Sequence, residues 1–107
     1  MWIWSLDDRL INLDLVESIE LLEVYADGAD PVQLEAGAVD PEAFELVAVM
    51  ASGHETLLFD TEDVETAYKA YEALADLVAR GASVNGVPVT KPLSVIELLE
   101  SDRRAQN

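Results

Sequence analysis

The chain has 107 residues, of which 50% are hydrophobic, and it carries a formal net charge of −16. This hydrophobic share is too high for an intrinsically disordered chain, and the length suits a single soluble domain, residues 1–107, with its own core. No apolar run approaches the roughly 20 residues that a membrane-spanning helix needs, the chain contains no cysteine for disulfides or thiolate metal sites, and we expect a cytoplasmic location.

The negative charge is concentrated in one long stretch of the sequence. Between Leu10 and Tyr68 there are fifteen acidic residues and no lysine or arginine. Direct binding to nucleic acid or to an anionic membrane surface requires basic side chains, so we expect neither. A basic protein partner, bound cations or a salty medium would each suit such a charge, and acidity also serves solubility alone.

The first predicted element is an aromatic strand at the start of the chain. Trp2 and Trp4 share one face of this strand, Asp7-Asp8 forms a turn, and residues 10–13 form a return strand. A terminal strand often lies at a sheet edge, and tryptophan offers a large contact area there. Our hypothesis is a homo-oligomer formed through this strand, and core packing of the two tryptophans is the alternative.

Residues 15–26 allow two interpretations. Asp14 and Glu17 have the spacing of a capping box, which favours a helix. The apolar positions Ile19 and Leu21 also suit an extended chain. We favour the strand.

The next segments predict a loop followed by an antiparallel hairpin. Two Asp-Pro steps and several small residues make 29–41 a long loop. Alternating apolar residues then predict a strand at 44–50, and a second strand follows at 55–60 after the turn at Ser52-Gly53-His54.

The clearest signal is a helix over residues 62–80. Thr61 is its predicted N-cap, and Glu62 and Asp63 lie near the positive end of the helix dipole. Gly81 supplies a left-handed stop. The apolar residues that follow the helical period are Val64, Ala67, Tyr68, Tyr71, Leu74, Ala75 and Val78. We expect this face, including Tyr68 and Tyr71, to lie in the core.

After the helix, Val84-Asn85-Gly86-Val87 predicts a hairpin turn, and Pro88 restricts the following strand to a sheet edge. Ser94 with Glu97 forms a capping box that opens a short helix, and the polar tail 101–107 is expected to fray. The fold class is therefore α+β: a small antiparallel sheet of about 4–6 strands packed by one long helix. Residues 82–107 form an extension packed on the unit at 1–81.

Several short motifs support a resemblance to a known group of domains. They are the N-terminal aromatic strand, Leu10-Ile11-Asn12-Leu13 with Val16 and Ile19, the step Phe59-Asp60-Thr61-Glu62, and the helix with Tyr68 and Tyr71. Together they resemble small uncharacterised bacterial and phage domains with a minimal pleckstrin-homology-like sheet closed by one helix, over roughly residues 2–80. The loop at 27–43 and the part after Gly81 depart from that pattern. The group has no assigned activity, so the resemblance implies a fold alone.

No catalytic centre is evident in the sequence. The single histidine, His54, lies in a predicted turn, where it is rarely oriented towards a nucleophile. Phosphate-binding glycine loops and a nucleophile elbow are absent. The two acidic clusters are Asp60, Glu62, Asp63 and Glu65, and Asp27 with Asp30. Neither matches a calcium loop. We therefore expect no enzyme activity, no metal and no cofactor.

The sequence favours a non-enzymatic protein-interaction module whose acidic surface or sheet edge binds another protein. The candidate interaction residues are Trp2, Trp4, Asp27, Asp30, Asp60, Glu62 and Asp63. Two alternatives remain open at this point. One is a DNA mimic that inhibits a nucleic-acid-binding protein, and the other is a structural domain adapted to high salt.

Overall fold

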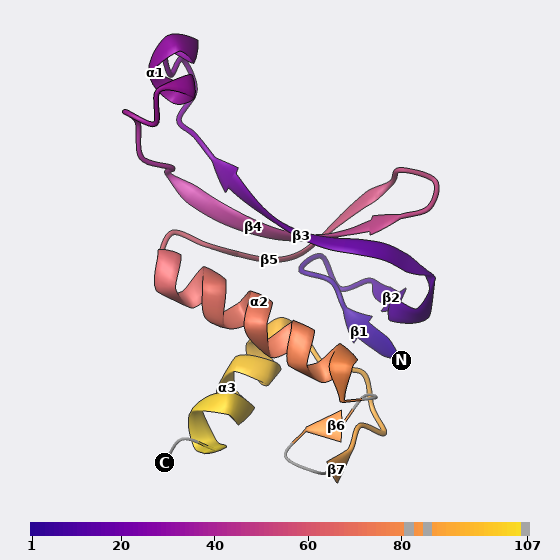
Figure 1. Ribbon diagram of the computed structural model, residues 1–107. Helices are drawn as coiled ribbons and strands as arrows, with labels where there is room; N and C mark the ends of the chain where they lie inside the picture. Colours follow the sequence, from indigo (N-terminus) through magenta and orange to yellow (C-terminus); the bar gives the residue numbers. More distant parts are fainter. Residues whose placement is uncertain (81–82, 85–86, 106–107) are drawn as a thin grey trace.

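The computed structural model describes residues 1–80, 83–84 and 87–105 and has the predicted α+β class (Figure 1). The strands are β1 (Trp2–Trp4), β2 (Leu10–Asn12), β3 (Val16–Val24), β4 (Ala43–Met50), β5 (Glu55–Thr61), β6 (Ser83–Val84) and β7 (Val87–Pro88). The helices are the 3₁₀ turn η1 (Leu13–Leu15), α1 (Pro31–Glu35), α2 (Val64–Ala79) and α3 (Val95–Ala105). No helix among the described residues is both long and apolar enough to cross a membrane.

The described strands form three antiparallel ladders instead of one sheet. The central ladder has the order β3-β4-β5, while β1 pairs only with β2 and β6 only with β7. The β1–β2 hairpin does not extend the central sheet, although its Ile3 side chain is fully buried in the same core. The amide of Leu6, just after β1, instead donates to the Leu57 carbonyl of β5 at 2.9 Å.

The two hairpins predicted from the first half of the chain are confirmed. β1 and β2 pair with Ile3 opposite Ile11, and Asp8 takes the left-handed φ of 62° in the turn between them. β4 and β5 pair across the turn that contains Gly53. The ambiguous segment is a strand, β3, and the helical alternative is wrong because residues 16–24 pair with β4 along their length.

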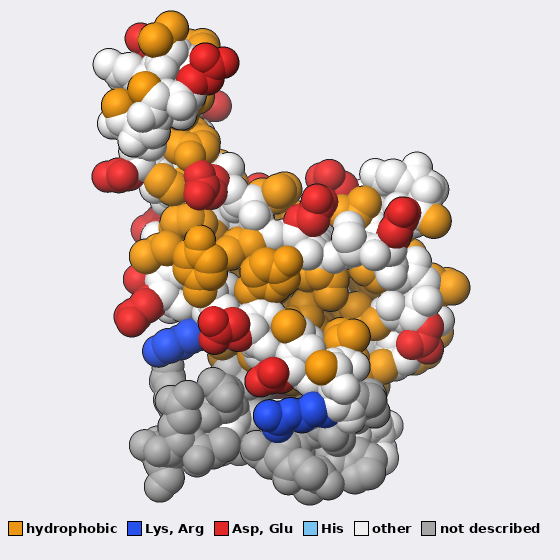
Figure 2. Space-filling view, in the orientation of Figure 1, with side chains coloured by type: hydrophobic (Ala, Val, Ile, Leu, Met, Phe, Trp, Pro, Cys, Tyr) orange, Lys and Arg blue, Asp and Glu red, His pale blue; other side chains and the backbone are white. Residues whose placement is uncertain are grey.

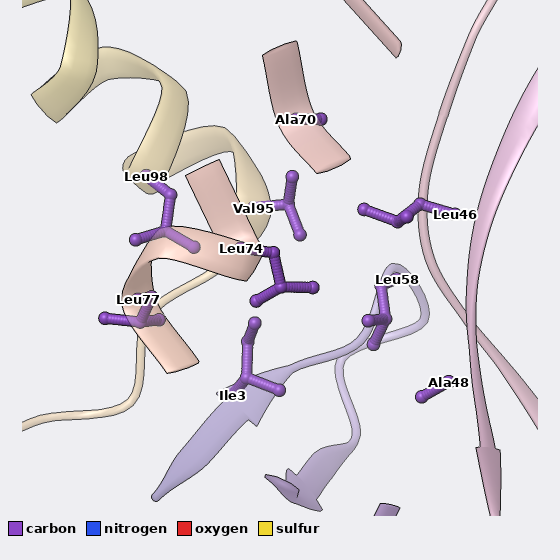
Figure 3. Close-up of a cluster of buried hydrophobic side chains, with 9 residues drawn as sticks. All are labelled: Ile3, Leu46, Ala48, Leu58, Ala70, Leu74, Leu77, Val95 and Leu98. Atoms are coloured by element: carbon purple, nitrogen blue, oxygen red, sulfur yellow. The ribbon is translucent and has the colours of Figure 1, made fainter. Parts of the chain in front are cut away.

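The core lies between the central sheet, α2, α3 and β1. Its buried side chains are Ile3, Leu46, Ala48, Leu58, Ala70, Leu74, Leu77, Val95 and Leu98. Figure 3 shows Leu74 among Ile3, Leu58 and Val95, which come from three other elements. A helix that buries one residue every three or four positions contributes a narrow stripe, and α2 does so through Ala67, Ala70, Leu74 and Leu77.

The long helix begins two residues later than predicted. Asp63 is its N-cap and keeps an extended backbone, and its carboxylate accepts hydrogen bonds from the Thr66 amide at 3.1 Å and the Thr66 hydroxyl at 2.5 Å. Thr61 instead ends β5, and its hydroxyl accepts from the Asp63 amide at 3.1 Å. Asp63 is favoured over Thr61 as the cap because its carboxylate accepts from two donors of Thr66 in the first turn. The predicted stop, Gly81, lies outside the described residues.

Two predictions at the edges of the fold need correction. The segment 29–41 is not wholly a loop, because Asp30 caps the short helix α1 and Pro31 occupies its first turn. The first part of the tail predicted to fray continues α3 as far as Ala105, and residues 106–107 lie outside the described residues. The Ser94–Glu97 capping box is confirmed, with the Glu97 amide 3.2 Å from the Ser94 hydroxyl. The predicted turn at 85–86 lies outside the described residues, between β6 and β7.

The core stripe of α2 can be tested with one pair of truncations. Leu74 is fully buried, whereas Val78, one turn later, is 55% exposed. Leu74→Ala should lower the free energy of unfolding by about 2–5 kcal/mol, because it removes buried methyl groups and leaves a cavity. Val78→Ala should change it by no more than about 0.5 kcal/mol. Urea denaturation followed by circular dichroism measures both, and equal losses would contradict this orientation of α2.

The cap at Asp63 makes part of the stability depend on pH. The hydrogen bonds from Thr66 lower the pKa of the Asp63 carboxyl in the folded protein. A lowered folded pKa means that the stabilisation is complete above the unfolded value of about 3.9 and disappears as the pH falls through the folded value. The melting temperature of wild type should therefore be higher than that of Asp63→Ala at neutral pH, and the difference should disappear in acid. Asp63→Asn keeps a capping oxygen without a charge. The difference in melting temperature between Asp63→Asn and Asp63→Ala should therefore not change with pH. Melting temperatures between about pH 6 and pH 2 test this, and parallel curves for wild type and Asp63→Asn would refute it.

Candidate functional site

Two neighbouring hollows lie between α2 and the side of the sheet formed by β3, and we call this region the groove. The first, about 390 Å³, lies between the beginning of β3 and the second half of α2, where Ile19, Tyr71 and Val78 line it. The second, about 460 Å³, lies between the end of β3 and the first turns of α2. We call the second one the acidic hollow; its lining residues are Glu23, Asp40, Pro41, Phe44, Glu62, Asp63, Val64 and Tyr68.

The apolar side of the groove comes from a second stripe on α2. Beside the buried stripe, the helix presents Val64, Tyr68 and Val78, which are 48%, 54% and 55% exposed. The expectation that Tyr68 lies in the core is therefore wrong. The apolar arc of α2 is wider than the contact that the sheet and α3 can cover. Figure 2 shows apolar surface gathered over the first half of α2 and the adjoining strands, with acidic side chains around it.

Tyr71 joins the helix to the far wall of the groove. Its ring is half-buried against the core, as expected from the helical period, and its hydroxyl donates to the Ile19 carbonyl of β3 at 3.0 Å. This hydrogen bond crosses from α2 to the outermost strand of the sheet. It therefore fixes the separation of the two groove walls at one point.

Four carboxylates surround the apolar floor of the acidic hollow. They are Glu23 at the end of β3, Asp40 before β4, and Glu62 and Asp63 before α2. None of the described lysines or arginines lines either hollow. Asp63 is already engaged with Thr66 as the helix cap. The other three carboxylates give the hollow a negative potential directed at its mouth.

Glu23 is oriented by a neighbour on its own chain. The Tyr25 hydroxyl donates a hydrogen bond to the Glu23 carboxylate. This bond raises the pKa of the Tyr25 phenol, and the negative charges of Glu23 and Asp40 raise it further. Asp40 and Glu23 therefore act on the same local environment, although they are distant in the sequence.

The structure separates the candidate residues predicted from the sequence into several places. Asp27 and Asp30 lie on the segment that carries α1, which projects away from α2 in Figure 1. Asp60 is exposed on β5 and does not line the hollow. Only Glu62 and Asp63 line it.

The predicted free edge at β1 is not present. β1 pairs with β2 on one side, and on the other side Ile3 forms a parallel bridge with Leu93, with the Trp4 amide donating to the Leu93 carbonyl at 2.9 Å. Trp2 remains 50% exposed and Trp4 is half-buried. A contact through Trp2 would therefore use its side chain, because the backbone edge of the strand is occupied.

Sequence reasoning missed Glu23, Asp40, Phe44 and the exposure of Tyr68. Glu23, Asp40 and Phe44 come together only because β4 pairs with β3 next to the start of α2. No spacing of nearby residues in the sequence predicts this contact. The exposure of Tyr68, in contrast, is indicated by the sequence pattern. The apolar residues of the predicted helix cover an arc too broad for one contact face. They occupy two sets of positions, which are 64, 68, 71, 75 and 78, and 67, 70, 74 and 77.

The described residues contain no group of three or more histidine, aspartate or glutamate side chains placed to hold a metal ion. His54 is exposed in the β4–β5 turn, and its amide approaches the Ser52 hydroxyl at 3.4 Å. The chemistry that the groove offers is apolar contact combined with negative charge.

Comparison with protein-family models, with curated proteins and with solved structures found no match to this chain. The resemblance to small bacterial and phage domains stays a prediction.

The proximity of Glu23, Tyr25 and Asp40 can be checked by titration. Glu23→Gln removes the acceptor charge, so the pKa of the Tyr25 phenol should fall towards its ordinary value. Glu20→Gln removes a charge three residues earlier, on the opposite face of β3, and should change the Tyr25 pKa less. Ultraviolet difference titration, with Tyr25→Phe identifying the signal, measures both. Equal shifts for the two variants would contradict the contact.

Proposed function

We propose that this chain is a non-enzymatic protein-interaction module of the cytoplasm that binds a basic protein partner at the acidic hollow. The observation that supports this most directly is an exposed apolar floor ringed by carboxylates. Val64 and Tyr68 supply the exposed apolar surface, and Phe44, which is 8% exposed, also lines the hollow. Tyr68 is the kind of large, rigid side chain that contributes strongly to binding energy.

The charge around the floor selects the partner. Glu23, Asp40 and Glu62 attract lysine and arginine and repel acidic segments, which gives specificity and speeds association. Desolvating an apolar floor next to these charges favours a ligand that carries both apolar and basic groups. This combination supports a protein segment over a small inorganic cation.

The DNA-mimic and high-salt alternatives receive less support from the same surface. A DNA mimic needs a continuous face of carboxylates, and half of the residues that line this hollow are apolar. Adaptation to salt gives no reason to leave an aromatic side chain exposed on the main helix.

A displayed library of random dodecapeptides tests the proposed function. Selection on wild type should enrich peptides that contain lysine or arginine together with large apolar residues, and their affinity should fall as salt rises. Glu62→Gln should weaken binding about fivefold by removing a carboxylate of the hollow. Asp60→Asn removes the same charge two residues away but outside the hollow, and should leave the affinity within about twofold. The proposal fails if no such peptides are enriched, or if the two variants weaken binding equally.

A further inference from the structure

The outer edge of β3 has no strand paired to it among the described residues. The central ladder runs β3-β4-β5, so β3 and β5 are its two ends. The β5 end is contacted by Leu6, whose amide donates to the Leu57 carbonyl. An unpaired strand edge is a template for a further strand.

Two hydrogen bonds establish which groups of β3 face outwards. The Met50 amide donates to the His54 carbonyl at 2.9 Å, so Met50 faces β5. Backbone groups alternate along a strand, and the β4 residues that face β3 are therefore Glu45 and Val47.

The partners of Glu45 and Val47 are Leu22 and Glu20, and these two β3 residues thus face β4. The intervening residues Ile19, Leu21 and Glu23 direct their amides and carbonyls to the free edge. The Tyr71 hydroxyl, which reaches the Ile19 carbonyl from outside the sheet at 3.0 Å, agrees with this assignment.

Among the described residues, no α2 side chain bonds to the part of the edge closest to the acidic hollow. Tyr71 occupies the carbonyl of Ile19, whereas Leu21 and Glu23 lie further along β3, towards the hollow. Glu23 belongs both to the free edge and to the lining of the hollow. A chain paired with Leu21 and Glu23 would thus lie beside Tyr68 and Val64.

We propose that the partner segment binds in an extended form and adds to β3 at Leu21–Glu23 as a further strand of the sheet. This inference rests on the proposed function and specifies the bound conformation. Alternate side chains of the added strand point to opposite faces. One set enters the acidic hollow over Phe44 and Tyr68 and is apolar. The other set lies beside Glu20 on the opposite face of β3 and is basic, and the carboxylates around the hollow attract it at longer range.

A second copy of this chain is a poor occupant of the same edge. Two β3 strands paired with each other would bring Glu17, Glu20 and Glu23 of both copies together, and like charges opposite one another are destabilising. The same carboxylates attract a basic strand. Charge therefore selects a segment of a different protein that alternates apolar and basic residues.

The probe for this proposal is an end-blocked octapeptide of alternating valine and lysine. Two derivatives carry N-methyl groups, one on every valine and one on every lysine, so that charge and side chains are kept. In an added strand only one set of amides faces β3. One derivative should therefore lose binding at least about tenfold, and the other should bind within about threefold of the parent, as measured by calorimetry.

Amide hydrogen exchange locates the contact on the full chain. The parent peptide should slow exchange at Leu21 and Glu23 at least about tenfold, and should leave Glu20 and Leu22, which already face β4, unchanged. Failure of the octapeptide to bind, equal effects of the two methylated derivatives, or binding without protection at Leu21 and Glu23 would each overturn strand addition. Library peptides that bind the hollow in such a case would still support the proposed function, whereas a library without enrichment would remove it.

Discussion

The rest of the structure depends on the contact that α2 makes with the sheet. Leu74 and its neighbours in the buried stripe pack against Leu46 and Leu58, and this contact sets the rotation of the helix about its axis. With that rotation fixed, Val64 and Tyr68 must face outwards, because they lie about a quarter to a third of a turn from Leu74 on the same helix. Val78 is exposed next to the end of the helix at Ala79. The groove beside β3 is therefore a consequence of core packing.

Charge then decides what such an exposed apolar surface can do. An uncovered apolar strip beside a free strand edge usually promotes self-association. Here the glutamates along β3 and the carboxylates around Phe44 oppose contact between identical chains. They do so without covering the apolar floor, as binding of the basic segment that we propose requires.

Features that depend on residues close together in the sequence could be predicted, and features that depend on distant residues could not. Local signals predicted α2, the β4–β5 hairpin and the Ser94 cap, since each depends on residues a few positions apart. The predicted helix cap, Thr61, was wrong by two residues, and the cap is Asp63. Both side chains can accept a hydrogen bond from a nearby amide, and only the path of the backbone decides between them. The acidic hollow could not be predicted. Its walls come from three chain segments, and their meeting depends on the register between β3 and β4.

The bridge between Ile3 and Leu93 has a consequence for the order in which the protein folds. The cluster that buries Ile3 includes Val95 and Leu98, which lie more than 90 positions later in the sequence. Loop closure over such a span carries a large entropic cost, so this contact forms late. The sheet and α2 can assemble first from contacts between nearer segments, and the β1–β2 hairpin completes the core only once α3 packs beside it.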